Sequence, residues 1–271
     1  MTQLKAVLQA CEELWPAAGA EAWDAPGLLV GSPGQRVSKV LLTVDITNEV
    51  VQEAIDGNFD AIIAHHPFLL KGIQNLSGEQ AKGATLTKAI KNEIAIFSAH
   101  TNADIVPTGV SDVLASKIGI VFPLPLVETQ RGIGHGRIGN LPKAVTLGDF
   151  AKTLAKILPA TAGGVRVAGD YHQQISKVAV CGGAGDSFIS QAVAQGADVY
   201  VTSDLRHHVV QDAREQATLA QTGPAIIDIS HWAAEWLWLG VACDQLRQIV
   251  PTVKFEVCDL RTDPWDFIVT Q

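Results

Sequence analysis

Three short apolar runs of this sequence end in side chains of the types that bind metal ions. Each run is rich in β-branched residues and stops at polar residues, which is typical of a buried strand followed by a loop. The residues at the three ends are His65 and His66, His100 and Asp104, and His231 and Glu235. Open α/β sheets bind ligands just beyond the carboxyl ends of their strands. If the three strands are neighbours, four imidazoles and two carboxylates meet there, and the pattern predicts a metal site.

The donor set favours two ions of zinc, iron or manganese, for which imidazole and carboxylate are usual ligands. Adjacent histidines on a regular strand point to opposite faces, so a turn directly after the strand would let each reach a different ion. A carboxylate can bridge two ions that are about 3.5–4 Å apart. The predicted arrangement is His65 and His231 on one ion, His66 and Asp104 on the other, and Glu235 between them. So few protein ligands per ion leave room for water, as in catalytic sites.

The composition indicates a globular protein with well-buried sheets. Apolar residues make up 47% of the 271 residues and charged residues 18%. The formal charge of −8 argues against a nucleic-acid-binding protein, whose surface should be basic. The four cysteines lie far apart and form no CxxC pair, which argues against a disulfide framework and a structural zinc site.

The compartment follows from the same features. Widely spaced cysteines are typical of a reducing environment. The first residues lack the basic and then apolar form of a signal peptide, and no uncharged apolar run reaches the length of about 18 residues that a membrane span needs. We therefore expect a cytoplasmic protein that has no membrane partner and no nucleic-acid partner.

Helices and strands are predicted to alternate along the chain. The apolar spacing predicts helices over residues 4–14, 48–57, 85–92, 111–118, 146–158 and 231–249. Strands are predicted over 37–45, at the three apolar runs, and over 165–168, 177–181 and 197–201, with a turn-rich β segment at 132–139. The predicted helix N-caps are Asn48, Ser111, Thr146 and Ser230. Strand, helix and strand within 37–66 form a βαβ unit, which implies parallel pairing.

The predicted fold class is α/β, with two interlaced lobes whose central sheets are mostly parallel and a metal site at the carboxyl ends of the strands. The composition changes near residue 123, which suggests a linker. We assign 1–127 to the first lobe and 128–224 to the second. Residues 225–271 are predicted to return to the first lobe, because His231 and Glu235 can assist the adjacent histidines only if their strand or helix lies beside them.

Two further motifs have alternative interpretations. The glycine-rich segment 181–186 lies between a strand and a predicted helix, where backbone N–H groups bind phosphate in some proteins. It lacks the GxGxxG pattern and the Walker lysine, so tight packing of the turn is the favoured explanation of the glycines. Asp204 and His208 follow another strand and either line the site or serve as a cap and a surface histidine. The remaining histidines, His135, His172 and His207, are interpreted as loop residues.

The ordered motifs resemble the Nif-three-like family of dinuclear-metal proteins, whose members are often labelled GTP cyclohydrolase I type 2 homologues. The resemblance rests first on Ile62-Ile-Ala-His-His-Pro-Phe68, Ser98-Ala-His-Thr-Asn-Ala-Asp104 and Ser230-His-Trp-Ala-Ala-Glu235. The segments 23–31, 134–139, 180–185 and 202–208 stand in the family's order. Two departures are Ala25-Pro26 in the opening motif and Ser203 where the family pattern has glycine.

The resemblance implies two α/β lobes, a ring-shaped homohexamer and a dinuclear centre that faces its cavity. It implies the same five ligands: His65, His66, Asp104, His231 and Glu235. His100 matches a family position near the metals, as a second-shell residue or a proton shuttle. The family also has longer members with an inserted domain, and this chain resembles the short form.

The residues leave several functions open. The first is a metal-dependent hydrolase that acts on a phosphorylated or nucleotide-like small molecule, in which His100 or His208 relays protons. The second is a metal-storage, metal-delivery or regulatory protein without catalysis. The third is an adaptor for protein partners in which the site only stabilises the fold. The sequence specifies neither the native metal nor the substrate.

Overall fold

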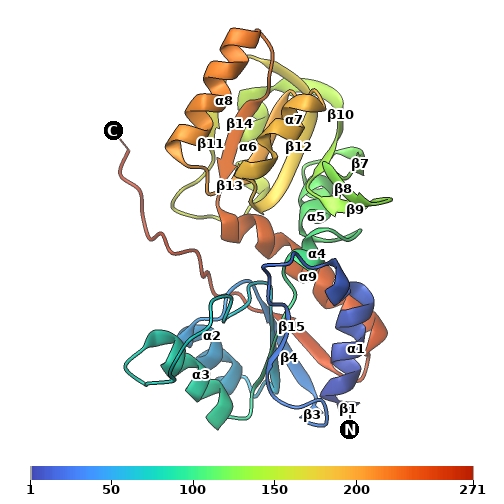
Figure 1. Ribbon diagram of the computed structural model, residues 1–271, viewed down its shortest axis with the longest axis vertical. Coiled ribbons are helices and arrows are strands. Elements are labelled where there is room, and N and C mark those ends of the chain that lie inside the picture. Colours follow the sequence, from blue (N-terminus) through green and yellow to red (C-terminus); the bar gives the residue numbers. More distant parts are fainter. Residues whose placement is uncertain (1, 271) are drawn as a thin grey trace. The chain divides into compact units, whose positions relative to one another are not determined.

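The strands that precede His65 and His100 belong to a five-stranded sheet (Figure 1). The computed structural model describes residues 2–270. In sheet order the strands are β15 (Lys254–Val257), β4 (Lys39–Thr43), β5 (Ala61–Ala64), β6 (Ala95–Ser98) and β2 (Gly27–Val30). All neighbours pair in parallel except β2, which is antiparallel to β6. The sheet is thus mostly parallel, as predicted.

β5 and β6 place His65 and His100 at the same edge of this sheet. All four residues of β5 are buried, which suits a continuous apolar strand inside a parallel sheet. The register aligns Ala64 with Ser98, so the two strands end level with each other. The residues that follow therefore emerge side by side.

Helices cover both faces of the five-stranded sheet. They are α1 (Leu4–Leu14), α2 (Asn48–Asp56) and α3 (Ala81–Lys91). α2 and α3 pack on one face, where Val50, Val51 and Leu86 share an apolar cluster with strand residues such as Ile62. α1 lies on the other side of the sheet (Figure 1). The rigid core beneath the strand ends fixes the position of the histidines.

A second, six-stranded sheet contains the strand before His231. In sheet order its strands are β11 (Arg166–Ala168), β14 (Ala225–Ile229), β13 (Val199–Ser203), β12 (Gln174–Ala184), β10 (Arg137–Thr146) and β7 (Val121–Leu124). Only β12, β13 and β14 pair in parallel with one another, and the other pairs are antiparallel. This sheet is therefore mixed, whereas a mostly parallel sheet was predicted.

The remaining helices are α4 (Thr101–Asp104), α5 (Val110–Lys117), α6 (Leu147–Ile157), α7 (Ile189–Ala194), α8 (His207–Ala220) and α9 (His231–Ile249). Short 3-10 helices and two-stranded ladders complete the description: η1 (Ala17–Gly19), η2 (Asp186–Phe188), β1 (Thr2–Gln3) with β3 (Arg36–Val37), and β8 (Val127–Gln130) with β9 (Ile133–His135). Among the described helices, none is long and apolar enough to cross a membrane.

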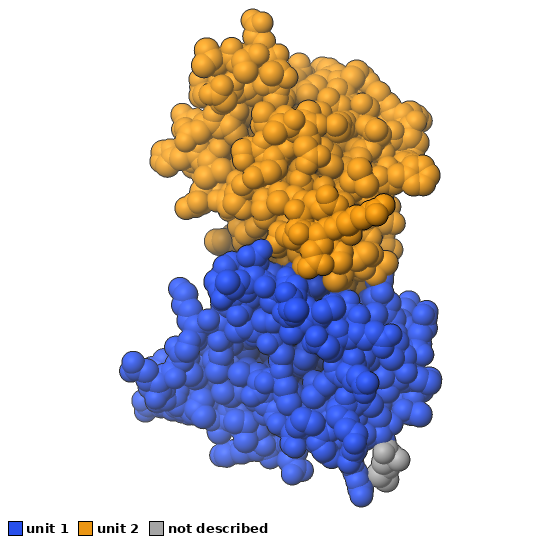
Figure 2. All heavy atoms as spheres, turned by 45° about the vertical axis from the view of Figure 1, so that its right-hand side comes forward, with its two compact units in different colours: residues 1–103, 239–262 blue, residues 104–238, 263–271 orange. Residues whose placement is uncertain are grey.

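The chain divides into two compact units, coloured in Figure 2. Unit 1 comprises residues 1–103 and 239–262, and unit 2 comprises 104–238 and 263–271. The predicted return of the chain at residue 225 differs from this division, because β14 pairs with β13 and β11 in the sheet of unit 2. The chain instead re-enters unit 1 at Leu239, inside α9.

Two predicted helix caps are correct and two are wrong. Thr146 accepts a hydrogen bond from the N–H of Asp149, and Ser230 accepts one from Ala233. For α2, however, the neighbouring Thr47 is the cap rather than Asn48. The hydroxyl of Ser111 does not cap α5, since it accepts a hydrogen bond from Gly182 at 3.1 Å. Adjacent polar residues compete for a cap, and sequence alone does not rank them.

A buried arginine holds the elements of unit 2 together around β10. Arg137 is 2% exposed, and its Nε donates to a carboxylate oxygen of Asp112 in α5 at 2.8 Å. Its other nitrogens donate to the backbone carbonyls of Gly134, Gly136, Val106 and Ile105. The glycine-rich segment 132–139 therefore carries a structural residue of its own.

Candidate metal centre

Three imidazoles converge in unit 1 at the ends of β5 and β6. His65, His66 and His100 each offer one ring nitrogen, and these three atoms lie within 4.8 Å of one another. The ring centroids are 5.1 to 5.4 Å apart. His65 is fully buried, while the other two are partly exposed. The arrangement suits a metal ion, because several nitrogen donors face one small volume.

The Nδ1 atom of each ring is engaged by the protein. His65 Nδ1 lies 2.8 Å from the Ala99 carbonyl oxygen. His66 Nδ1 lies 2.7 Å from Asp45, and His100 Nδ1 lies 2.8 Å from Asp24. Such a partner fixes the ring orientation and places the proton on Nδ1, which leaves Nε2 as the ligand atom.

The two carboxylates that orient these histidines are themselves held in place. Asp24, which has no exposed side-chain surface, accepts from the backbone N–H of Thr101 at 3.0 Å and from its hydroxyl. Asp45 accepts from the Thr262 hydroxyl at 2.6 Å. Sequence reasoning did not assign either residue, although Asp45 is the polar residue that ends the predicted strand 37–45.

The surroundings keep His100 in the neutral form. Burial is the largest cause that lowers the pKa of His100, followed by the neighbouring His65, and together they outweigh the opposing effect of Asp24 and bring the pKa to about 4. Burial by itself raises the pKa of Asp24, but the hydrogen bonds from Thr101 and His100 outweigh it and lower that pKa. A neutral imidazole beside an ionised carboxylate is the state in which histidine binds metal.

We expect Asp45→Ala to weaken metal binding at His66 by about 10–100-fold, because the ring loses the partner that orients it. The measurement is competition for zinc against a calibrated chelator. Asp56→Ala removes an exposed carboxylate from α2 and is the control. Equal affinities for the two variants would show that Asp45 does not act through His66.

A second pair of side chains of the types that bind metal, His231 and Glu235, lies in unit 2 at the start of α9. His231 Nε2 is 2.9 Å from Oε1 of Glu235, one helical turn later on the same face. Glu235 is 2% exposed. His231 Nδ1 is 2.7 Å from the Asp204 carboxylate. The sequence left open whether Asp204 lines the site or serves as a cap. In the structure its carboxylate orients His231.

The two carboxylates control the protonation of His231. Burial by itself lowers the pKa of His231, but Glu235 and Asp204 outweigh it and raise the pKa to about 11. A metal ion that binds at Nε2 must displace this proton, so its affinity at this histidine depends on pH. The same two carboxylates supply the negative charge that favours a cation.

Two candidate ligands in unit 2, Asp104 and Glu235, carry negative charges that act on the same buried side chain. Both carboxylates act on the buried thiol of Cys181, whose pKa is raised to about 12, mainly by burial and then by these charges. Asp104 is the last residue of α4 and is partly exposed. Burial and these charges keep the free thiol protonated.

The glycine-rich segment after β12 is explained by close packing. A Cβ atom on Gly182 would lie 2.5 Å from Val110, and one on Gly185 would lie 2.5 Å from the Thr202 hydroxyl. A Cβ on Gly183 would lie 2.7 Å from Oε1 of Glu235. Of the two interpretations of this motif, these approaches support packing of the turn.

We expect Gly183→Ala to displace Glu235 and to weaken metal binding about tenfold, since ligands must be held to about 0.5 Å. Gly183 has φ +74, so alanine also costs about 1–2 kcal/mol of backbone strain. Gly196→Ala is a matched control, with φ +67 and open space around the added methyl. The check is metal affinity and urea stability of both variants. Equal metal affinities would contradict the role of Gly183.

The other predicted proton-relay residue lies apart from these groups. His208 is exposed in the first turn of α8, where its ring contacts His207 at a centroid distance of 5.1 Å. Its role in catalysis stays a prediction. His135, interpreted from the sequence as a loop residue, instead ends strand β9, and its ring stacks on Phe188.

Known proteins are similar to this one over nearly the whole chain. A model of the Duf34/NIF3 (NGG1p interacting factor 3) family matches residues 2–264. A Streptomyces coelicolor protein named GTP cyclohydrolase 1 type 2 homolog is 41% identical, over 98% of this chain and 94% of that protein. A Clostridium perfringens protein of the same name is 31% identical, over 98% and 100%.

Solved structures and a longer relative agree with this match. A Bacillus cereus protein related to NIF3 superposes with a TM-score of 0.90 at 26% identity, over 98% of this chain and 99% of that one. The alignment with a Mycobacterium leprae relative needs 373 positions, which exceeds the length of this chain, so that relative carries additional residues. The ordered motifs, the fold and these matches together show that the chain belongs to the Duf34/NIF3 family.

Proposed function

We propose that this protein binds two divalent metal ions per subunit and uses them to hydrolyse a phosphorylated or nucleotide-like small molecule. The ligands are His65, His66, Asp104, His231 and Glu235, and the ions are zinc, iron or manganese. The observation that carries the proposal is the convergence of three imidazoles whose offered nitrogens lie within 4.8 Å of one another.

The donor chemistry fits such ions. His66 and His231 each have a carboxylate on Nδ1, at 2.7 Å in both cases, as metal-binding histidines usually do. Imidazole and carboxylate donors together suit borderline metals such as zinc and iron. The two donor groups also stand beside the points where the chain passes from one unit to the other: unit 2 begins at Asp104, and α9 re-enters unit 1 after Trp238.

Bound ions of this kind lower the pKa of a coordinated water and stabilise negative charge on a phosphoryl or ring oxygen. The protein contributes a neutral His100, with a pKa of about 4, which is able to accept a proton at Nε2 while Asp24 holds Nδ1. Asp24, Asp45 and Asp204 keep three rings in fixed orientations. The name GTP cyclohydrolase 1 type 2 homolog borne by the relatives supports a hydrolase in general terms.

A second candidate is a metal-storage, metal-delivery or regulatory protein without catalysis. The observation that favours it is the protonated state of His231, since binding and release of metal then respond to pH. A carrier should pass its metal to a chelator readily, whereas a catalyst should retain it. Exchange rates measured with a coloured chelator distinguish the two.

The experiment that tests the hydrolase is a screen of phosphoesters and nucleotides, GTP included, with the metal-loaded protein. We expect at least one substrate whose turnover is lost in His65→Ala and in Glu235→Ala, while circular dichroism shows that both variants remain folded. Full turnover by both folded variants would contradict the proposal. Absence of turnover across the screen together with rapid metal exchange would support the second candidate.

The assembly and the compartment are also part of the proposal. The resemblance to the family implies a homohexamer, which sedimentation of the untagged protein tests. We place the protein in the cytoplasm, on account of its widely spaced cysteines.

A further inference from the structure

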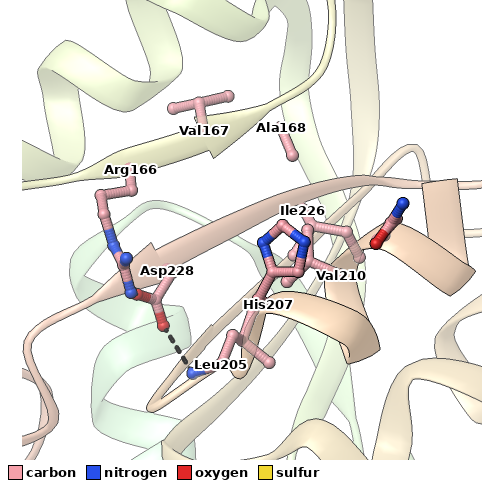
Figure 3. Close-up of a pocket in the computed structure, with 9 residues that line it drawn as sticks. Arg166, Val167, Ala168, Leu205, His207, Val210, Ile226 and Asp228 are labelled. Atoms are coloured by element: carbon pink, nitrogen blue, oxygen red, sulfur yellow. Dashed lines mark hydrogen bonds and ion pairs between the residues drawn. The ribbon is translucent and has the colours of Figure 1, made fainter.

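A pocket of about 380 Å³ lies in unit 2 beneath the first turn of α8 (Figure 3). It is separate from the metal-binding side chains, none of which lines it. Its volume falls within the range of small-molecule sites, roughly 300–1,000 Å³. The lining combines an apolar floor with polar groups on one side, which is the usual composition of a ligand site.

The floor is made by the edge of the six-stranded sheet. β11 pairs antiparallel with β14, so that Ala168 stands opposite Ile226 and Arg166 opposite Asp228 on the same face. Leu205 and Val210 close the pocket from the side of α8. Ala168, a short side chain of the edge strand, is among the residues that line the space.

α8 is seated loosely over this edge. None of its residues from His207 to Ala220 is buried, although Val209, Val210 and Ala213 pack partly against the apolar cluster below. A helix without buried residues gains little from its own packing. A ligand between α8 and β11 would supply apolar contacts that the helix now lacks.

The polar side of the pocket offers donors. Arg166 donates from Nε to Asp228 at 2.9 Å and from Nη2 to the same oxygen, while the other oxygen of Asp228 accepts from the N–H of Leu205 at 3.1 Å. Asp228 is thus satisfied on both oxygens and does not attract a cation. The guanidinium, whose side chain is 67% exposed, has further N–H groups, because arginine carries five.

We propose that this pocket binds a small monocarboxylate that has an aromatic or branched apolar body. The body lies over Ala168, Ile226 and Val210, and the carboxylate accepts hydrogen bonds from Arg166 (Figure 3). His207 and Gln211 also line the pocket. Planar bidentate recognition of carboxylate is the particular property of arginine. A phosphate dianion fits less well than a monocarboxylate, because it brings two negative charges to a single guanidinium that already pairs with Asp228.

The test is ligand-observed fluorine NMR of the full-length protein with 4-fluorophenylacetate and its neutral analogue 4-fluorophenylacetamide. We expect saturable binding of the acid with a Kd of about 1 mM or tighter, and weaker binding of the amide. Arg166→Gln should weaken binding of the acid roughly tenfold, as the loss of a charged hydrogen-bond partner does. Ala168→Phe should abolish binding of both probes by filling the pocket.

The matched control is Arg214→Gln. Arg214 lies in α8 and does not line the pocket, so this variant should bind the acid as the wild type does. Three outcomes would overturn the proposal: equal affinities for acid and amide, binding that persists in the folded Ala168→Phe variant, or no saturable signal up to about 10 mM. None of them bears on the metal centre, which this experiment does not involve.

Discussion

Replacement of Glu235 by alanine is expected to lower the metal content from about two ions per chain to about one or fewer. Glu235 is buried, with Oε1 2.9 Å from His231 Nε2, and a bridging carboxylate serves both ions of a two-metal site. If Glu235 bridges the two ions, as proposed, its loss would remove a ligand from each of them. The variant should still fold, because alanine is compatible with the interior of α9.

Elemental analysis of untagged protein, wild type beside variant, measures this effect. Glu215→Ala removes an exposed carboxylate from α8 and should leave the metal content unchanged. A wild-type content near zero that added zinc, iron or manganese does not restore would refute the metal centre. It would also move the protein-adaptor function to first place.

Replacement of Arg137 by methionine is expected to destabilise the protein by about 3 kcal/mol, because the hydrogen bonds of a buried guanidinium to four backbone carbonyls and to Asp112 are lost. Methionine fills the volume but donates no hydrogen bond. The Asp112 carboxylate and the backbone carbonyls of residues 105, 106, 134 and 136 then each lose one hydrogen bond to the guanidinium. The loss of a buried hydrogen-bond network is among the few causes of a large effect on stability.

Urea unfolding followed by circular dichroism measures the change. Arg131→Met alters an exposed arginine a few residues earlier in the same segment and should change stability by less than about 0.5 kcal/mol. Similar midpoints for the two variants would mean that water replaces the guanidinium at little cost. The buried arginine would then not be the residue that stabilises this region.

Elements with strong local signals could be predicted from the sequence. The bounds of α1, β14 and α9 agree with the prediction, because a long amphipathic period or a β-branched run determines them locally. The sheet to which β14 belongs could not be predicted in this way. Strand pairing depends on which edge is free, and an argument from the histidines placed β14 in the wrong sheet.

The candidate site was predicted only in part, for a related reason. His65, His66 and His100 each follow or end an apolar run, which makes them visible in the sequence. Their orienting carboxylates act through a hydrogen bond across the fold, and Asp45 and Asp24 are 21 and 76 residues away from their histidines. The helical and strand periodicities of the sequence do not reveal a hydrogen bond between residues so far apart. A useful signal is an acidic residue that follows a predicted strand, which would have selected Asp45.

The chain passes between its units at residues 103–104, 238–239 and 262–263, and two of these three passages lie inside helices, α4 and α9. A helix is a continuous rod of backbone hydrogen bonds rather than a tether. The units are therefore not modules that recombination can shuffle or that a cut in a surface loop can separate. Any gene rearrangement that exchanged one unit would sever a helix that carries a candidate ligand, so the two units are expected to be inherited together.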